Sequence, residues 1–482
     1  MSKDSTQPVA PDVNNSPLLL LKAVLNDLPS DSVILLRPVP QSFCELRDDI
    51  DLLLTESTRD MLLEAAYRLA VAGHLHFRVE QNRNEKVRLT IWNLDATRSI
   101  AVDLWSGIAQ LGGWRKHVLI SAEDLVHYKS RDLTSHNHEI DGEVLESWPA
   151  VSRLQPRLEF CLYVLHLASK RKRIDAPAVT DRLHQMQNRM AETEEGVPDW
   201  FRACVTPAAK QRKLTHTGWL KALCWLGQLD VADRKLQFAS RPRQRRRRLA
   251  AAARNWFNRS KPWIAFCGCD GVGKSTLLQR ITRNTPDLTS FAAKKFYRRS
   301  LTYQIAGGLW RRSVGWSRCD LDDSIPVLLT LRGAVAAAVQ RSLSRITMRR
   351  RPAMLLDRSL ADPLIRFRKT DRPEPVRKDG GLSRFLSSTP TVLMVADHSS
   401  LSRRKQEMTP SGGQRYQHLL FRRALDSHAC DVICFANSLP LDRASAALRK
   451  CIGTAWIDSA KPPAVEQRTR PASDPADVRR AA

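Results

Sequence analysis

The chain has 482 residues, which is too many for one ordinary hydrophobic core and suggests two or three domains. Its formal charge is +27, from 77 Lys and Arg against 50 Asp and Glu, and such a balance makes nucleic acid a candidate partner. Much of the excess lies in arginine clusters at 241–248 and 349–352. Because such clusters suit nucleotides or acidic surfaces equally well, we do not favour nucleic acid.

Composition also argues against a secreted, zinc-stabilised or membrane-spanning protein. The ten cysteines lack the paired spacing of a zinc site and the density of a disulfide scaffold. Residues 1–16 are polar and lack the apolar core of a secretory signal. The longest apolar run, 325–340, is interrupted by Arg332 and is too short to cross a bilayer. We therefore expect a cytoplasmic protein without a membrane span.

Residues 17–147 alternate between helical and strand patterns. We expect helices over 18–28 and 57–72 and strands over 32–37 and 49–54. Three further strands are rich in β-branched and aromatic residues and are flanked by polar ones, at 74–80, 87–93 and 100–106. The pattern predicts an α+β domain with a half-exposed mixed sheet.

Residues 148–258 have a mainly helical pattern, because strand patterns disappear from about residue 150 and helical spacing follows. The helical segments are 158–170, 179–190 and 218–229, followed by a basic helix that begins in the arginine run. We expect a helical linker or small subdomain.

Residues 259–457 alternate strand and helix in the manner of a parallel α/β domain. Apolar strands are expected over 263–267, 353–357, 391–396 and 433–436. The two ends of the chain, 1–16 and 458–482, have no apolar period and are expected to be disordered. The predicted fold class is thus a multidomain α/β protein.

A phosphate-binding motif begins this last domain. Gly268, Gly273, Lys274 and Ser275 satisfy the pattern G-x-x-x-x-G-K-[ST], between the apolar strand 263–267 and a helical segment. Glycines let the backbone N–H groups converge on phosphate oxygens at a helix N-terminus. The lysine can reach the β- and γ-phosphates, and the Ser275 hydroxyl can bind Mg²⁺.

The loop "GCDGVGKST" resembles that of the thymidylate kinase family, G-x-D-G-x-G-K-[ST]-T. The resemblance implies ATP and Mg²⁺ as cofactors and makes the whole loop a nucleotide site: Gly268, Cys269, Asp270, Gly271, Val272, Gly273, Lys274, Ser275 and Thr276. The pair Asp357-Arg358 at a strand end resembles the Asp-Arg pair of those kinases. It implies that Asp357 holds Mg²⁺ and that Arg358 binds the acceptor's phosphate.

The basic segment after the strand at 391–396 resembles the lid of the same kinases. Its candidates for stabilising the transferring phosphoryl group are Arg403, Arg404, Lys405 and Arg415. The arginine-rich stretch 300–350 departs from the family pattern, so the acceptor stays open between a nucleoside monophosphate and another small metabolite.

Three acids in the first domain suggest a second site. Asp49 and Asp51 point to one face of a strand, and Asp103 lies in another apolar strand. Such a set can clamp two Mg²⁺ ions across a reacting phosphate, and it resembles the nucleotidyltransferase superfamily that includes DNA polymerase beta. Ser42 lacks the preceding glycine of active members. An active site, a binding fold that has lost its activity, and plain surface acids therefore all stay open.

Three functions follow from these patterns. The first is an ATP- and Mg²⁺-dependent phosphotransferase that uses Lys274, Asp357, Arg358, Arg403 and Arg404. The second is a nucleotidyltransferase that uses Asp49, Asp51 and Asp103, with the P-loop domain in a regulatory role. The third is an ATP-gated binding protein acting through its arginine clusters. The oligomeric state is open, with a homodimer among the options.

Overall fold

The structure is a computed structural model, and two parts of the chain carry most of the described residues. We call residues 17–192 the head and residues 263–457 the P-loop half. The described residues are 17–36, 49–83, 85–112, 116–130, 139–140, 143–144, 149–170, 176–192, 263–285, 288–292, 353–357, 390–404, 409–426 and 431–457.

The head combines short helices with a mixed sheet. Its elements are α1 (Pro17–Leu25), β1 (Val33–Leu35), β2 (Ile50–Leu53), α2 (Glu56–Val71), β3 (His76–Arg83), β4 (Lys86–Trp92), β5 (Ser99–Trp105), β6 (Gly107–Gly112), β7 (Lys116–Ser121), α3 (Ala122–Leu125), η2 (Val126–Tyr128), β8 (Lys129–Ser130), β9 (Glu139–Ile140), β10 (Glu143–Val144), β11 (Val151–Leu154), α4 (Pro156–Lys170) and α5 (Pro177–Glu192). The helices and strands expected up to residue 106 are confirmed within a few residues at each end.

One strand contradicts the expectation that strands end at about residue 150. β11 pairs in parallel with β1, with Val33 opposite Val151, and antiparallel with β8. Val151 and Leu154 are buried. Ser152 and Arg153 interrupt the apolar residues of β11, so it lacks the apolar run by which β1 and β2 were recognised, and its pairing with β1 reveals it.

The described residues of the P-loop half contain five parallel strands. Its elements are β12 (Trp263–Cys267), α10 (Lys274–Asn284), β13 (Leu288–Ala292), β14 (Ala353–Asp357), β15 (Thr391–Val395), α16 (His398–Ser402), α17 (Pro410–Asp426), β16 (Asp431–Ala436), α18 (Leu441–Ile452) and a π-helical turn, η5 (Gly453–Ile457). The strand order is β13-β14-β12-β15-β16. The four strands expected here are confirmed, whereas β13 was not predicted.

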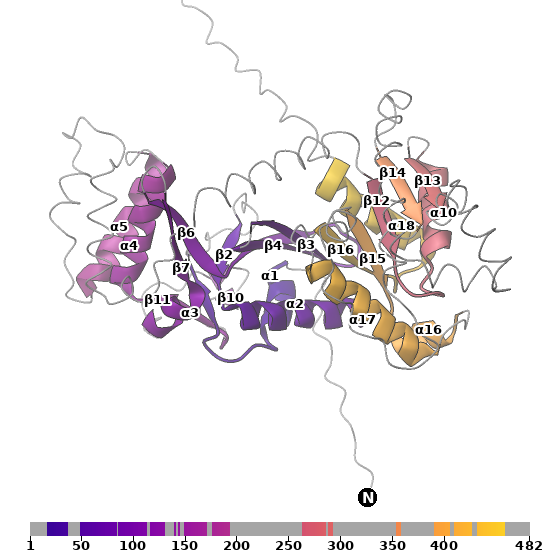
Figure 1. Cartoon of the computed structure of the whole chain (residues 1–482), viewed down its shortest axis with the longest axis horizontal. Helices are drawn as coiled ribbons and strands as arrows, with labels where there is room; N and C mark the ends of the chain where they lie inside the picture. Colours follow the sequence, from indigo (N-terminus) through magenta and orange to yellow (C-terminus); the bar gives the residue numbers. More distant parts are fainter. Residues whose placement is uncertain are drawn as a thin grey trace, which may run out of the picture.

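The sheets of the two halves form one continuous sheet of twelve strands. β16 of the P-loop half pairs antiparallel with β3 of the head, with Val432 opposite Val79 and Cys434 opposite Phe77. Figure 1 shows this sheet running across the molecule, with α2 and α17 along the same face. The ring of Tyr67 in α2 stacks on that of Phe421 in α17, with centroids 4.6 Å apart.

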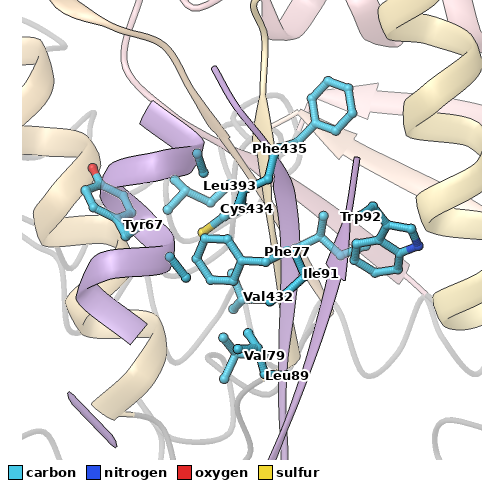
Figure 2. Packing of buried hydrophobic residues seen from close by; sticks show 14 of the residues in the cluster. Tyr67, Phe77, Val79, Leu89, Ile91, Trp92, Leu393, Val432, Cys434 and Phe435 are labelled. Atoms are coloured by element: carbon cyan, nitrogen blue, oxygen red, sulfur yellow. The ribbon is translucent and has the colours of Figure 1, made fainter. Parts of the chain in front are cut away.

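A shared hydrophobic core follows from this pairing. Figure 2 shows side chains of α2, β3 and β4 packed against those of β15 and β16. Phe77, Val79, Leu89 and Cys434 are at most 1% exposed, and burial of such side chains stabilises a fold by about 1.5–3 kcal/mol each. The large mixed sheet with flanking helices agrees with the predicted α/β class.

Several expectations fall on residues outside the described ones. These are the two tails, the helix at 218–229, both arginine clusters, Ser42, Arg358, Lys405 and the stretch 300–350. Among the described residues, no helix is both long and apolar enough to cross a membrane.

Candidate functional site

We call residues 268–275, which carry the phosphate-binding motif, the phosphate loop. It lies at the carboxyl end of the parallel strands. β12 ends at Cys267, and α10 begins at Lys274. β12 lies between β14 and β15, so the chain leaves it first toward one side of the sheet and later continues on the other. Ligand sites of open α/β sheets form at such a switch point.

Three glycines give the loop its curvature. Gly268, Gly271 and Gly273 have φ angles of 145°, 84° and 93°, which residues other than glycine seldom adopt. A Cβ on Gly273 would lie 2.6 Å from Nδ2 of Asn437, and one on Gly268 would lie 2.6 Å from the Met394 carbonyl oxygen. The neighbouring strand ends therefore pack closely against the loop.

The Lys274 side chain is buried inside this loop. Its Nζ donates to the carbonyl oxygens of Gly268, at 2.8 Å, and Cys269, at 2.7 Å. The Asp270 carboxylate lies 3.9 Å from the same Nζ. The ammonium group is thus held against the backbone of the loop.

Ser275 and Asp357 meet beside the lysine. The Ser275 hydroxyl donates to Asp357 Oδ2 at 3.3 Å, because Asp357 ends β14 opposite Phe266 of the adjacent β12. A hydroxyl and a carboxylate at the rim of a phosphate loop are hard oxygen ligands. They fit Mg²⁺, which binds one or two protein oxygens together with substrate phosphates.

Two further side chains hold the loop from outside. Arg404 donates to the carbonyl oxygens of Val272, at 3.0 Å, and Asn437, at 3.2 Å. Asn437 Nδ2 also donates to Val272 O, at 2.6 Å. Arg404 was predicted as a lid residue and lies at the loop, whereas Asn437 was not predicted. Its position directly after the last parallel strand is the signal that could have found it.

Cys269 packs below the loop and has a polar partner that sequence reasoning also missed. Gln417 of α17 donates to Cys269 Sγ at 3.2 Å and accepts from the Ala396 N–H at 2.9 Å. Burial raises the pKa of the Cys269 thiol, and Lys274 opposes this rise. The neutral thiol is a packing element of the loop.

The three other described side chains predicted for this site are exposed to solvent. They are Arg403, Arg415 and Thr276, the last in the first turn of α10. Arg403 ends α16 and forms the cap of that helix. The structure thus brings together Lys274, Ser275, Asp357 and Arg404.

The three acids of the head lie on two adjacent parallel strands or at their ends. Asp51 of β2 is directly opposite Asp103 of β5, and Asp49 precedes β2 by one residue. Each carboxylate has a partner from another strand of the sheet. Trp105 donates to Asp51 at 2.9 Å, Arg88 pairs with Asp49, and Lys86 pairs with Asp103.

This cluster does not fit a two-Mg²⁺ site as placed. The ammonium of Lys86 and the guanidinium of Arg88 already neutralise two of the carboxylates. Among the described residues, no group of three or more His, Cys, Asp or Glu side chains could hold a metal ion. Burial raises the pKa of Asp103, Lys86 lowers it, and the other two acids raise it. The cluster therefore forms an internally paired charge network.

No protein-family model matches the chain, and no curated protein matches its sequence.

Proposed function

We propose that the protein is an ATP- and Mg²⁺-dependent phosphotransferase of the nucleotide-kinase type. The observation that carries this proposal is the convergence of Lys274, Ser275 and Asp357 on one glycine-rich loop. In this proposal, residues 259–457 form a thymidylate-kinase-like P-loop domain. The nucleotidyltransferase-like domain of this proposal takes in residues 17–147 together with β11, which pairs with β1, and the chain from there to residue 258 connects it to the P-loop domain.

In this proposal, different groups of the site have different roles in phosphate binding. The backbone N–H groups of the loop and the Lys274 ammonium bind the β- and γ-phosphates and stabilise charge on the transferring group. When bound, Mg²⁺ would neutralise phosphate charge, held by the Ser275 hydroxyl and the Asp357 carboxylate. Arg404 and Asn437 keep the Val272 carbonyl, and with it the loop, in place.

The acceptor in this proposal is a nucleoside monophosphate or another small phosphorylated or hydroxylated metabolite. Asp270, half-buried at the loop, and Arg358 next to Asp357 would face it. An arginine suits a phosphate-bearing acceptor, because its fork of N–H groups binds two phosphate oxygens at once.

The test is a screen of phosphoryl acceptors with the full chain and γ-labelled ATP. We expect label on one acceptor class with the wild type and none with Lys274→Ala, since that variant loses the phosphate-binding cation. Unchanged thermal unfolding would show that the variant is folded. Equal turnover by wild type and a folded Lys274→Ala would disprove the proposal.

One observation favours a nucleotidyltransferase as the second candidate. Asp51 and Asp103 face each other in register on adjacent strands, a spacing that suits acids acting together. This activity would release pyrophosphate and place a labelled adenylyl group on a product. It would be lost in Asp51→Asn and kept in Lys274→Ala, the opposite of the first candidate. The paired cations at the acids make it the weaker of the two.

A further inference from the structure

The last residue of β16 and the two residues after it, which we call the 436–438 turn, lie between the head and the phosphate loop. On the head side, the Ala436 N–H donates to Nδ1 of His76 at 3.1 Å. On the loop side, the adjacent Asn437 donates to Val272 O at 2.6 Å. Two hydrogen bonds from adjacent residues therefore lead from a strand of the head to the backbone that would surround the phosphates.

His76 is fixed in one orientation and one protonation state. A backbone N–H can only donate, so Nδ1 must carry the lone pair, and Nε2–H then donates to Leu94 O at 2.8 Å. The ring is fully buried and stacks on Phe435, with centroids 4.1 Å apart. Because both nitrogens and the ring face are engaged, the side chain cannot rotate without losing all three contacts.

His76 also explains how the sheet ends at this point. The ladder between β3 and β16 runs as far as Phe77 opposite Cys434. Beyond it, the Ala436 N–H has no strand partner, and the imidazole takes the place of a carbonyl oxygen. An unsatisfied buried N–H would cost about 1–3 kcal/mol, so this contact defines the path of the turn.

A second residue of the head lies close to the same turn. Gly73, after α2, has a φ of 79°, and a Cβ there would lie 2.9 Å from Cβ of Ser438. The close approach leaves the turn no room to move toward the head. Gly73 and His76 together enclose residues 436–438 from the head side.

We propose that the head positions the phosphate loop, through the buried contacts from His76 to the 436–438 turn and from Asn437 to Val272. His76, Gly73 and Asn437 are then positioning residues. That the head positions the loop is independent of what the loop binds. The effect on ATP affinity, by contrast, rests on the proposed function. The geometry of the loop thus depends on a histidine of the head whose contact, Ala436, lies 360 residues away from it in sequence.

The test compares the full-length wild type with His76→Phe, which keeps the stacking surface and loses both hydrogen bonds. The first readout is hydrogen exchange of the amides of residues 268–274 without ligand, and we expect faster exchange. The second is the dissociation constant for MgATP, which we expect to rise by about 5- to 30-fold. Arg443→Ala is the matched control, because its exposed pair with Asp95 crosses the same interface without touching the turn.

Asn437→Ala should reproduce both effects. The double variant with His76→Phe should lose less affinity than the product of the single losses, because both act on one turn. Gly73→Ala, which pushes on Ser438 and leaves His76 intact, replaces His76→Phe if that variant does not fold. We expect the same changes at the loop.

The outcomes separate this proposal from the proposed function. Folded His76→Phe or Gly73→Ala protein with wild-type loop exchange would overturn the positioning role, whatever the ATP affinity. If loop exchange is faster in the variants but the wild type does not bind MgATP, the positioning role is supported and the phosphotransferase is refuted.

Discussion

The Ser275 hydroxyl lies 3.3 Å from the Asp357 carboxylate, although 82 residues separate the two in the sequence. The adjacent strands β12 and β14 bring them together, since both end at the same edge of the parallel sheet. This pair, next to the buried Lys274, supports the proposal that Mg²⁺ and ATP bind at this edge.

Replacing Ser275 by Ala should weaken Mg²⁺ binding and so raise the Mg²⁺ concentration that ATP turnover requires. We expect the Mg²⁺ concentration at half-maximal activity to rise by about 10- to 100-fold, since one of two protein oxygens is lost. The measurement is a Mg²⁺ titration at fixed ATP. Thr282→Ala is the control, because that hydroxyl donates to Leu278 O within the same helix. An unaltered titration in Ser275→Ala would remove Ser275 from the site.

Replacing Gly273 by Ala should disrupt the phosphate loop. The new Cβ would meet Asn437 Nδ2 at 2.6 Å, at a φ of 93°, where a side chain alone costs about 1–2 kcal/mol. We expect MgATP binding to fall below detection in calorimetry. In Gly413→Ala the nearest atom is the flexible end of Leu401, at 3.2 Å, and binding should persist. Equal affinities of the two variants would contradict this reading.

Asp431→Ala should weaken the junction between the halves. Asp431 accepts two hydrogen bonds from Arg78, at 2.8 and 3.1 Å, and one from Trp456 at 2.7 Å. We expect the free energy of unfolding to fall by about 2–3 kcal/mol, because a half-buried guanidinium loses its main partner. Urea unfolding measures the change, and Arg443→Ala, at an exposed pair, should lose much less. A loss no larger than in that control would contradict the prediction.

His76 should make stability depend on pH. Burial lowers its pKa to about 4 from 6.5, against the opposing effects of Leu94 O and the nearby Asp95, which pairs with Arg443. The unfolded chain binds a proton on falling through pH 6.5, whereas the folded one does not until about pH 4. Stability is therefore complete above about pH 6.5 and falls by about 2–3 kcal/mol toward pH 4. Urea unfolding of wild type and His76→Phe at pH 4.5 and 7 checks this, since the variant should lose this component. Equal pH dependence in both would show that another group is responsible.

Lys86→Met should leave a buried charge at Asp103. Lys86 lowers the pKa of Asp103 against the effect of burial, so its removal raises that pKa further. We expect a loss of about 2–4 kcal/mol at neutral pH, which shrinks at low pH as Asp103 becomes protonated. The double variant with Asp103→Asn should recover much of the loss in urea unfolding. A loss that is the same at pH 5 and pH 8 would argue against this charge as the cause.

Local patterns predicted most of the secondary structure and the loop at 268–275. Apolar runs, glycine spacing and the lysine determine the backbone conformation of a few residues around them. These signals lie close together in the sequence and can be recognised there. They also identified Asp357 as a residue at a strand end. By contrast, β11 was missed because Ser152 and Arg153 interrupt its apolar residues.

The sequence alone therefore determined the phosphate loop, the alternation of strands and helices in both halves, and the acids of the head. Only the tertiary structure joined β3 to β16, paired Lys86 with Asp103, and placed His76 against Ala436. Those contacts connect residues up to 360 positions apart. Which strand edges meet depends on the complementary shape and hydrogen-bonding groups of both surfaces, and no single stretch of sequence contains both.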